Sequence, residues 1–162
     1  MVLICGAQFV LQLDFSIVNV ALPTIQADLH MAAAELQWVV TGYALTFGSL
    51  LLVGGRLADL VGRRRLLVIG LIAFGLASLA CGLAQWPVML IIARLAQGSA
   101  GALVSPAALS LLTTTNAEGT ARNRALAIWQ ATTAAGATAG IVAGGLLTST
   151  RAGARCSWST RR

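Results

Sequence analysis

The chain has 162 residues, of which 57% are hydrophobic and only 10% are charged, whereas a soluble domain carries about 25% charged residues. This composition excludes an ordinary soluble domain and indicates an integral membrane protein. The formal net charge is +6, but aromatic residues do not alternate with the Arg clusters, so the charge does not indicate a nucleic-acid-binding surface.

Five apolar stretches are each long enough to cross a bilayer, because a hydrocarbon core of about 30 Å needs roughly 20 helical residues. They are residues 1–23, 36–55, 66–84, 88–112 and 124–147. The first stretch lacks the basic segment that opens a secretory signal, so we expect it to stay in the membrane. The sequence therefore predicts an all-α membrane protein whose residues 1–150 form a bundle of five transmembrane helices.

The first predicted span contains an acid, Asp14, near its middle. A carboxylate at the centre of a membrane helix costs about 2.5–3.5 kcal/mol on insertion scales. Acids in such positions usually belong to functional sites, although a protonated or water-contacting acid could persist without a role.

The links between the predicted spans alternate in charge. The links after the second and fourth spans carry Arg residues, whereas those after the first and third spans carry neither Lys nor Arg. Short cytoplasmic loops collect basic residues, so we expect a cytoplasmic N-terminus. Trp38 and Trp86 then lie at the opposite interface, where amphipathic indole rings are favoured.

The fourth predicted span contains a base, Arg94, six residues inside its outer end. At about 1.5 Å of rise per residue, its Cα lies about 9 Å deep, and Asp14 lies about 12 Å deep from the same side. We hypothesise that the two side chains share one polar cavity, so that protonating Asp14 weakens its hold on Arg94. The alternative is that Arg94 snorkels to the interface.

Small residues dominate the fifth predicted span. Gly136, Gly140 and Gly144 recur every four residues and Gly145 follows them. This spacing predicts a groove that packs closely against another helix, a feature also common in unrelated membrane helices. In the fourth span, Pro106 removes one backbone donor and favours a kink, with or without a mechanistic role.

A recognisable pattern fills the link between the second and third predicted spans. It reads Gly55-Arg56-Leu57-Ala58-Asp59-Leu60-Val61-Gly62-Arg63-Arg64-Arg65. The pattern resembles the signature loop of the major facilitator superfamily, G-x-L-[AS]-D-x-x-G-R-[RK]-[RK], at every defining position. Physically, Gly62 permits a tight turn and the Arg cluster favours the anionic inner leaflet. The resemblance implies that Asp59, Arg63 and Arg64 form a gating latch between two halves of a transporter.

Two further motifs resemble those of the fourteen-helix drug:proton antiporter branch of that superfamily. Residues 13–23 are similar to L-D-x-T-[IV]-V-N-V-A-L-P, with Ser16 in place of Thr, and residues 94–98 are similar to R-x-x-Q-G. The Gly-rich fifth span occupies the place of the antiporter motif, although the usual Gly-Pro pair is absent. The resemblance covers roughly residues 5–150.

The resemblance implies a bacterial inner-membrane exporter that exchanges small amphipathic, drug-like substrates for protons. It assigns four residues to the proton-coupling site and the substrate cavity, namely Asp14, Asn19, Arg94 and Gln97. A complete transporter of this kind has two bundles of six helices around a central cavity. The five predicted helices therefore represent part of the N-terminal bundle.

Residues 151–162 form a basic tail that does not fit this pattern. Five spans from a cytoplasmic N-terminus place its Arg residues outside, against the charge rule. A sixth span is expected near this point by resemblance. One interpretation is that the tail is an out-of-frame translation, and the other is that the chain is a short protein with a genuine basic tail.

Two functions remain open from the sequence. The first is a transmembrane transporter, here truncated, whose partners are protons, drug-like substrates, lipid and a missing second half. The alternative is a non-transporting membrane remnant or a protein that packs on another helical bundle. We predict no enzyme, metal or cofactor, because Cys5, Cys81, Cys156 and His30 form no catalytic or metal-ligand spacing.

Overall fold

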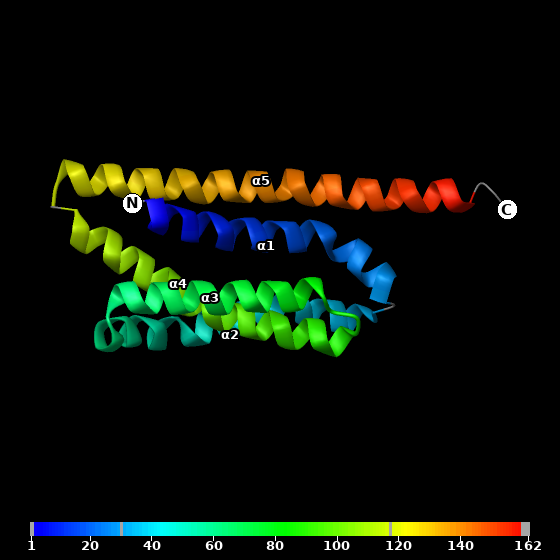
Figure 1. The fold of residues 1–162 in the computed structure, drawn as a ribbon, viewed down its shortest axis with the longest axis horizontal. Coiled ribbons are helices and arrows are strands. Elements are labelled where there is room, and N and C mark those ends of the chain that lie inside the picture. Colours follow the sequence, from blue (N-terminus) through cyan, green and yellow to red (C-terminus); the bar gives the residue numbers. More distant parts are fainter. Residues whose placement is uncertain (1, 30, 117, 160–162) are drawn as a thin grey trace.

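The computed structural model describes residues 2–29, 31–116 and 118–159, and it describes side chains as far as residue 146. This part of the chain forms five α-helices and no β-strand, which confirms the predicted all-α class. In chain order they are α1 (Val2–Leu29), α2 (Ala33–Val61), α3 (Arg63–Gly82), α4 (Pro87–Thr115) and α5 (Thr120–Ser159), as drawn in Figure 1. The predicted loop residue His30 and residues 160–162 of the predicted tail lie outside the described residues.

Each helix contains a segment that is long and apolar enough to cross a membrane, as the sequence predicts. The helices themselves are longer than the predicted stretches. Helix α1 continues past Pro23, and α5 continues through residues 151–159, which we had predicted as a separate tail. The reason is that hydropathy marks only the part of a helix that lies in lipid, whereas backbone hydrogen bonding continues into polar sequence.

The four links between the helices lie at the two ends of the bundle, two at each end. The α2–α3 and α4–α5 links lie at the end of the bundle where α1 begins, and the α1–α2 and α3–α4 links lie at the other end (Figure 1). Only Gly62 separates α2 from α3, and its φ of 96° is one that residues with a side chain rarely adopt. Glycine therefore permits the tightest turn of the fold.

The helices pack in two groups. Helix α1 lies along α5, and α4 packs extensively on both α2 and α3, whereas α1 meets α4 at far fewer positions (Figure 1). We refer to these groups as the α1–α5 pair and the α2–α3–α4 group. Residues that link the two groups are therefore of particular interest.

Glycines bring α5 close to α1. A Cβ placed at Gly136, Gly140 or Gly144 would lie 2.6–2.9 Å from an atom of α1, closer than real contacts allow. The predicted groove thus faces α1. Gly145 does not take part in this approach, because a Cβ there would meet no atom of the described residues within 4 Å.

A second close approach joins α2 to α4 and was not predicted. A Cβ at Gly98 would lie 2.5 Å from the carbonyl oxygen of Tyr43, and one at Gly54 would overlap the carbonyl of Ala102. Pro106, four residues after Ala102, has no N–H to donate to that carbonyl. The proline thus leaves an acceptor at the point where α2 comes nearest to α4.

Candidate functional site

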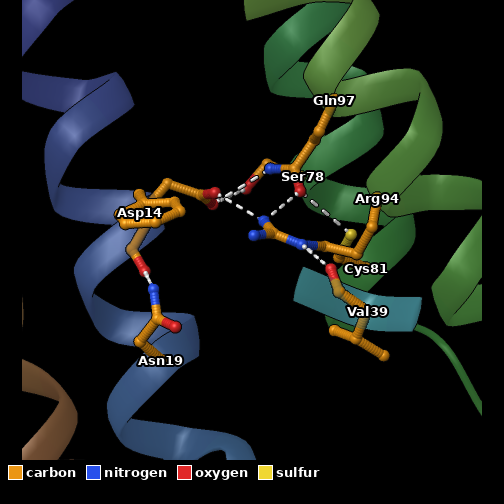
Figure 2. A network of polar contacts seen from close by, with 8 residues as sticks. Asp14, Asn19, Val39, Ser78, Cys81, Arg94 and Gln97 are labelled. Atoms are coloured by element: carbon orange, nitrogen blue, oxygen red, sulfur yellow. Dashed lines mark hydrogen bonds and ion pairs between the residues drawn. The ribbon is translucent and has the colours of Figure 1, made fainter. Parts of the chain in front are cut away.

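A buried ion pair joins the two helix groups. Arg94 Nη1 on α4 lies 3.0 Å from Asp14 Oδ2 on α1, and the two side chains are only 1% and 15% exposed (Figure 2). The sequence analysis paired these two charges because their predicted depths in the membrane are similar, and the structure brings them into contact. Removing an ion pair from water is costly unless further hydrogen bonds compensate both partners. The neighbouring residues provide those bonds.

Gln97 connects both members of the ion pair. Its Nε2 donates to Asp14 Oδ1 at 3.0 Å, and its Oε1 accepts a hydrogen bond of 2.8 Å from Arg94 Nη1. Residues three apart on a helix lie on the same face, so α4 presents Arg94 and Gln97 side by side. Gln97 is completely buried. The structure thus places Gln97 in the same site as Asp14 and Arg94.

Helix α3 contributes two residues that the sequence analysis did not assign. Ser78 Oγ donates to Asp14 Oδ1 at 3.2 Å, and Cys81 Sγ donates to Gln97 Oε1 at 3.2 Å. The signal that could have identified them is a pair of small polar residues, three apart, within an otherwise apolar span. Cys81 belongs to no catalytic or metal-ligand spacing in the sequence, and the structure places it in this network as a hydrogen-bond donor.

Helix α2 holds the other side of Arg94. Arg94 Nε donates to the carbonyl oxygen of Val39 at 3.3 Å, and the guanidinium carbon lies 4.6 Å from the ring centroid of Tyr43. The Tyr43 ring in turn stacks on Phe47 with centroids 5.9 Å apart and meets Phe15 at 5.7 Å. Neither Val39 nor Tyr43 was identified from the sequence.

Asn19 lies apart from this network. Its Nδ2 donates to the carbonyl oxygen of Phe15, one turn earlier on α1, at 2.8 Å. Figure 2 shows the amide turned away from Arg94. The expectation that Asn19 shares the site with Asp14 and Arg94 is therefore not met in this structure.

A cavity of about 570 Å³ reaches Asp14 between α1, α3 and α4. Ser78 and Cys81 line it near Asp14, and Asp28 lines it toward the end of the bundle that holds the α1–α2 and α3–α4 links. Most of the lining is apolar, but Asp14, Thr24, Asp28 and Ser78 supply polar partners for water in a cavity of this volume. The cavity thus offers a route by which a proton could reach the Asp14 carboxylate.

The Arg-rich segment was predicted as a link between spans, but it forms the end of α2 and the start of α3 around Gly62, at the opposite end of the bundle. Arg63 Nη2 lies 3.3 Å from Asp59 Oδ1, and this pair is exposed, unlike the pair in the membrane core. Arg64 is also exposed. A Cβ at Gly55 would meet no atom within 4 Å, so the close contact with α4 belongs to its neighbour Gly54. The structure leaves the proposed latch residues open to a further partner.

Five apolar helices around a buried, hydrogen-bonded ion pair define a multi-pass membrane protein with a charged centre, the architecture of transport proteins that move protons or solutes through the bilayer. Comparison with known proteins gives the family. The family model described as Major Facilitator Superfamily matches residues 4–159. The chain belongs to the Major Facilitator Superfamily, a family of transporters and not of enzymes.

Several antibiotic exporters and resistance proteins are similar to this chain. The puromycin resistance protein of Streptomyces alboniger is 47% identical over 148 residues, which are 91% of this chain and 29% of that protein. The cephamycin export protein of Amycolatopsis lactamdurans is 49% identical over 148 residues, 91% of this chain and 30% of that protein. The methylenomycin A resistance protein of Streptomyces coelicolor is 44% identical over 137 residues, 85% of this chain and 29% of that protein. This chain thus spans less than a third of the length of these relatives.

Proposed function

We propose that the chain works as part of a proton-coupled exporter of small, drug-like molecules, and that the Asp14–Arg94 pair couples proton movement to transport. The observation that carries the proposal is the ion pair itself, which lies buried between the α1–α5 pair and the α2–α3–α4 group. The names of the relatives support small antibiotics as the substrate class. Since those relatives are much longer, the activity is proposed for the assembled transporter.

The coupling step follows from charge. A proton that binds one Asp14 oxygen neutralises the carboxylate, and the attraction between Asp14 and Arg94 falls. Arg94 keeps its charge together with its bonds to Gln97 and Val39. Loss of the proton restores the ion pair. Because the pair joins two helix groups, each protonation state favours a different spacing between them.

The residues around the α2–α3 turn have a separate proposed role. We propose that Gly55, Asp59, Gly62, Arg63 and Arg64 form a gating latch on the cytoplasmic side. The Arg residues at this end support a cytoplasmic N-terminus in a bacterial inner membrane. Trp38 and Trp86, both exposed at the other end, support the same orientation.

A non-transporting role remains as the alternative. In that case the chain would be a membrane remnant or would pack on another bundle through exposed apolar helix faces, of which α5 has one at Ile141 and Val142. Proteoliposomes that contain this chain alone separate the two functions. We expect no drug-dependent proton flux from the chain alone, and robust flux would contradict our view that it acts only within a larger transporter.

A chimera tests the proposed coupling directly. The matched 148-residue segment of the Streptomyces alboniger protein is replaced by the corresponding part of this chain, and puromycin-dependent proton flux is measured in inverted vesicles. We expect flux with Asp14 and its loss with Asp14→Asn. Glu35→Gln is the matched acid-to-amide control, because Glu35 bonds only the start of α2, at the Ala32 N–H. Undiminished flux in Asp14→Asn would refute the role of the pair.

A further inference from the structure

Arg94 has two partners on α2 that carry no negative charge. They are the Val39 carbonyl, 3.3 Å from Arg94 Nε, and the Tyr43 ring, whose centroid lies 4.6 Å from the guanidinium carbon. Val39 and Tyr43 are four residues apart, so they lie on one face of α2. Both are buried. One turn of α2 therefore holds Arg94 independently of the charge on Asp14.

Hydrogen bonds satisfy only part of the guanidinium group. Nε and Nη1 have acceptors, but Nη2 is buried and has no hydrogen-bond partner within the part of the chain that the structure describes. An unsatisfied buried donor is costly. The face of an aromatic ring attracts a cation, most strongly when both are removed from water. The cation–π contact with the Tyr43 ring therefore stabilises a guanidinium group whose Nη2 has no hydrogen bond.

The Tyr43 ring is held firmly in place. Gly98 allows α4 to approach the backbone of Tyr43, since a Cβ at that position would lie 2.5 Å from its carbonyl oxygen. Phe47 stacks on the ring with an interplanar angle of 12°. A ring packed on Phe47 and carried by a closely packed backbone keeps its face toward Arg94 with little further loss of side-chain entropy.

The partners of Arg94 divide between the two helix groups. Asp14 belongs to the α1–α5 pair, whereas Val39, Tyr43 and Gln97 belong to the α2–α3–α4 group. Among the contacts of Arg94, neutralising Asp14 weakens only the one that crosses between the groups. The three contacts within the α2–α3–α4 group do not depend on that charge.

We propose that Tyr43 is a positioning residue for Arg94. When Asp14 takes up a proton, the Tyr43 ring and the Val39 carbonyl keep Arg94 in the α2–α3–α4 group, and the α1–α5 pair is the part that is released. This inference rests on the proposed proton-coupling role of Asp14. It adds the direction of the movement, because Arg94 stays with α2 while α1 moves.

The groups around Asp14 that carry charge or titrate come from four helices. Among the described residues, the fifth helix, α5, is not one of these four. Its Arg122 and Arg124 lie near its first residue, at the end of the bundle away from the Asp14 cavity. Those that face Asp14 or line its cavity are Arg94 from α4, Cys81 from α3, Tyr43 from α2 and Asp28 from α1. Asp14→Asn changes only one member of this set, so the test below uses that variant.

The chain contains a single tyrosine, which makes the inference directly measurable. Incorporated 3-fluorotyrosine labels Tyr43 alone, and its ¹⁹F resonance is recorded for the 162-residue chain in lipid nanodiscs. Arg94→Gln, which removes the cation, should displace the resonance. Asp14→Asn, which mimics the protonated carboxyl group, should displace it by less than half as much. An equal displacement would mean that Arg94 leaves the ring with Asp14, and would overturn the proposal.

Two controls make this result decisive. Ser49→Ala, at an exposed site on α2, should leave the resonance unchanged. If Asp14→Asn does not fold, as judged by helical circular dichroism, the wild-type chain is acidified and its resonance is compared with that of Arg94→Gln in the same way. A resonance that moves to the Arg94→Gln position on acidification would also overturn the proposal.

Fluorinated rings at position 43 distinguish the attraction between the ring face and Arg94 from the packing of the ring. Tyr43→Phe retains the face, whereas 3,4,5-trifluorophenylalanine at position 43 has nearly the same shape and a much weaker attraction for cations. We expect a lower unfolding temperature for the trifluoro variant than for Tyr43→Phe. Equal temperatures would reduce Tyr43 to a packing residue. These measurements need no transport, so a chimera without proton coupling would refute the proposed function and leave the Tyr43–Arg94 contact standing.

Discussion

Ser78 Oγ on α3 donates a hydrogen bond of 3.2 Å to the Oδ1 atom of Asp14 on α1. The same oxygen accepts from Gln97 Nε2 on α4 at 3.0 Å. One carboxylate oxygen therefore ties three helices together, and the other oxygen meets Arg94. The direct link between α3 and Asp14 makes Ser78 the simplest residue with which to test the network.

Replacing Ser78 with Ala should lower the free energy of unfolding by about 1 kcal/mol, a usual value for a polar contact between membrane helices. The measurement is reversible unfolding in mixed micelles with increasing sodium dodecyl sulfate, followed by circular dichroism. Ser49→Ala is the matched control, because within the described part of the chain Ser49 Oγ bonds only the Thr46 carbonyl of its own helix. Equal losses in the two variants would contradict the interhelical role of Ser78.

Gln97→Met should be more destabilising, by about 2 kcal/mol or more, because it removes one hydrogen bond from each of Asp14, Arg94 and Cys81 within a largely buried site. The same micelle unfolding measures it, with exposed Gln37→Met as the control. Since Ser78 and Gln97 donate to one oxygen, the double variant with Ser78→Ala should not equal the sum of the single changes. Strict additivity would show that the two residues act independently.

The sequence predicted the charged centre of the site but not the residues around it. Asp14 and Arg94 could be paired because each is costly in lipid and their depths along two helices can be counted. Ser78 has only the weak signal of a second polar residue, Cys81, three positions later. Tyr43 has no such signal, since the helix face that points inward decides its role. In a soluble helix an apolar face identifies the interior, but lipid is as apolar as the protein core, so that signal is lost.

The glycines illustrate the same limit. The spacing of Gly136, Gly140 and Gly144 predicted a groove, yet the partner helix, α1, became known only from the structure. Gly54 and Gly55 are adjacent in sequence, and only Gly54 contacts α4 closely. A rotation of about 100° per residue around the helix axis separates the two positions, and no property of the residues themselves reveals which one faces α4.

Gly140→Leu should separate α1 from α5. Even a Cβ at Gly140 would lie 2.7 Å from the Leu13 carbonyl oxygen, so a larger side chain forces the backbones apart and costs about 1–3 kcal/mol. Gly145→Leu is the control, because a Cβ there meets no atom of α1 or of the other described residues within 4 Å, and its effect should stay within about 0.5 kcal/mol. Micelle unfolding compares the two. A larger loss for Gly145→Leu would contradict the packing of α5 described above.

Gly62 and Gly48 should respond to Ala in opposite directions, although a Cβ at either would meet no atom within 4 Å. Gly62 has a φ of 96°, which costs a residue with a side chain about 1–3 kcal/mol, so Gly62→Ala should destabilise the chain. Gly48 lies inside α2, where Ala is favoured over Gly by about 0.5–1 kcal/mol, so Gly48→Ala should stabilise it. Thermal unfolding in nanodiscs measures both signs. Because neither substitution creates a clash, a destabilising Gly48→Ala would show that α2 is not held as a regular helix at that position, and a neutral Gly62→Ala would show that the α2–α3 turn does not require a positive φ.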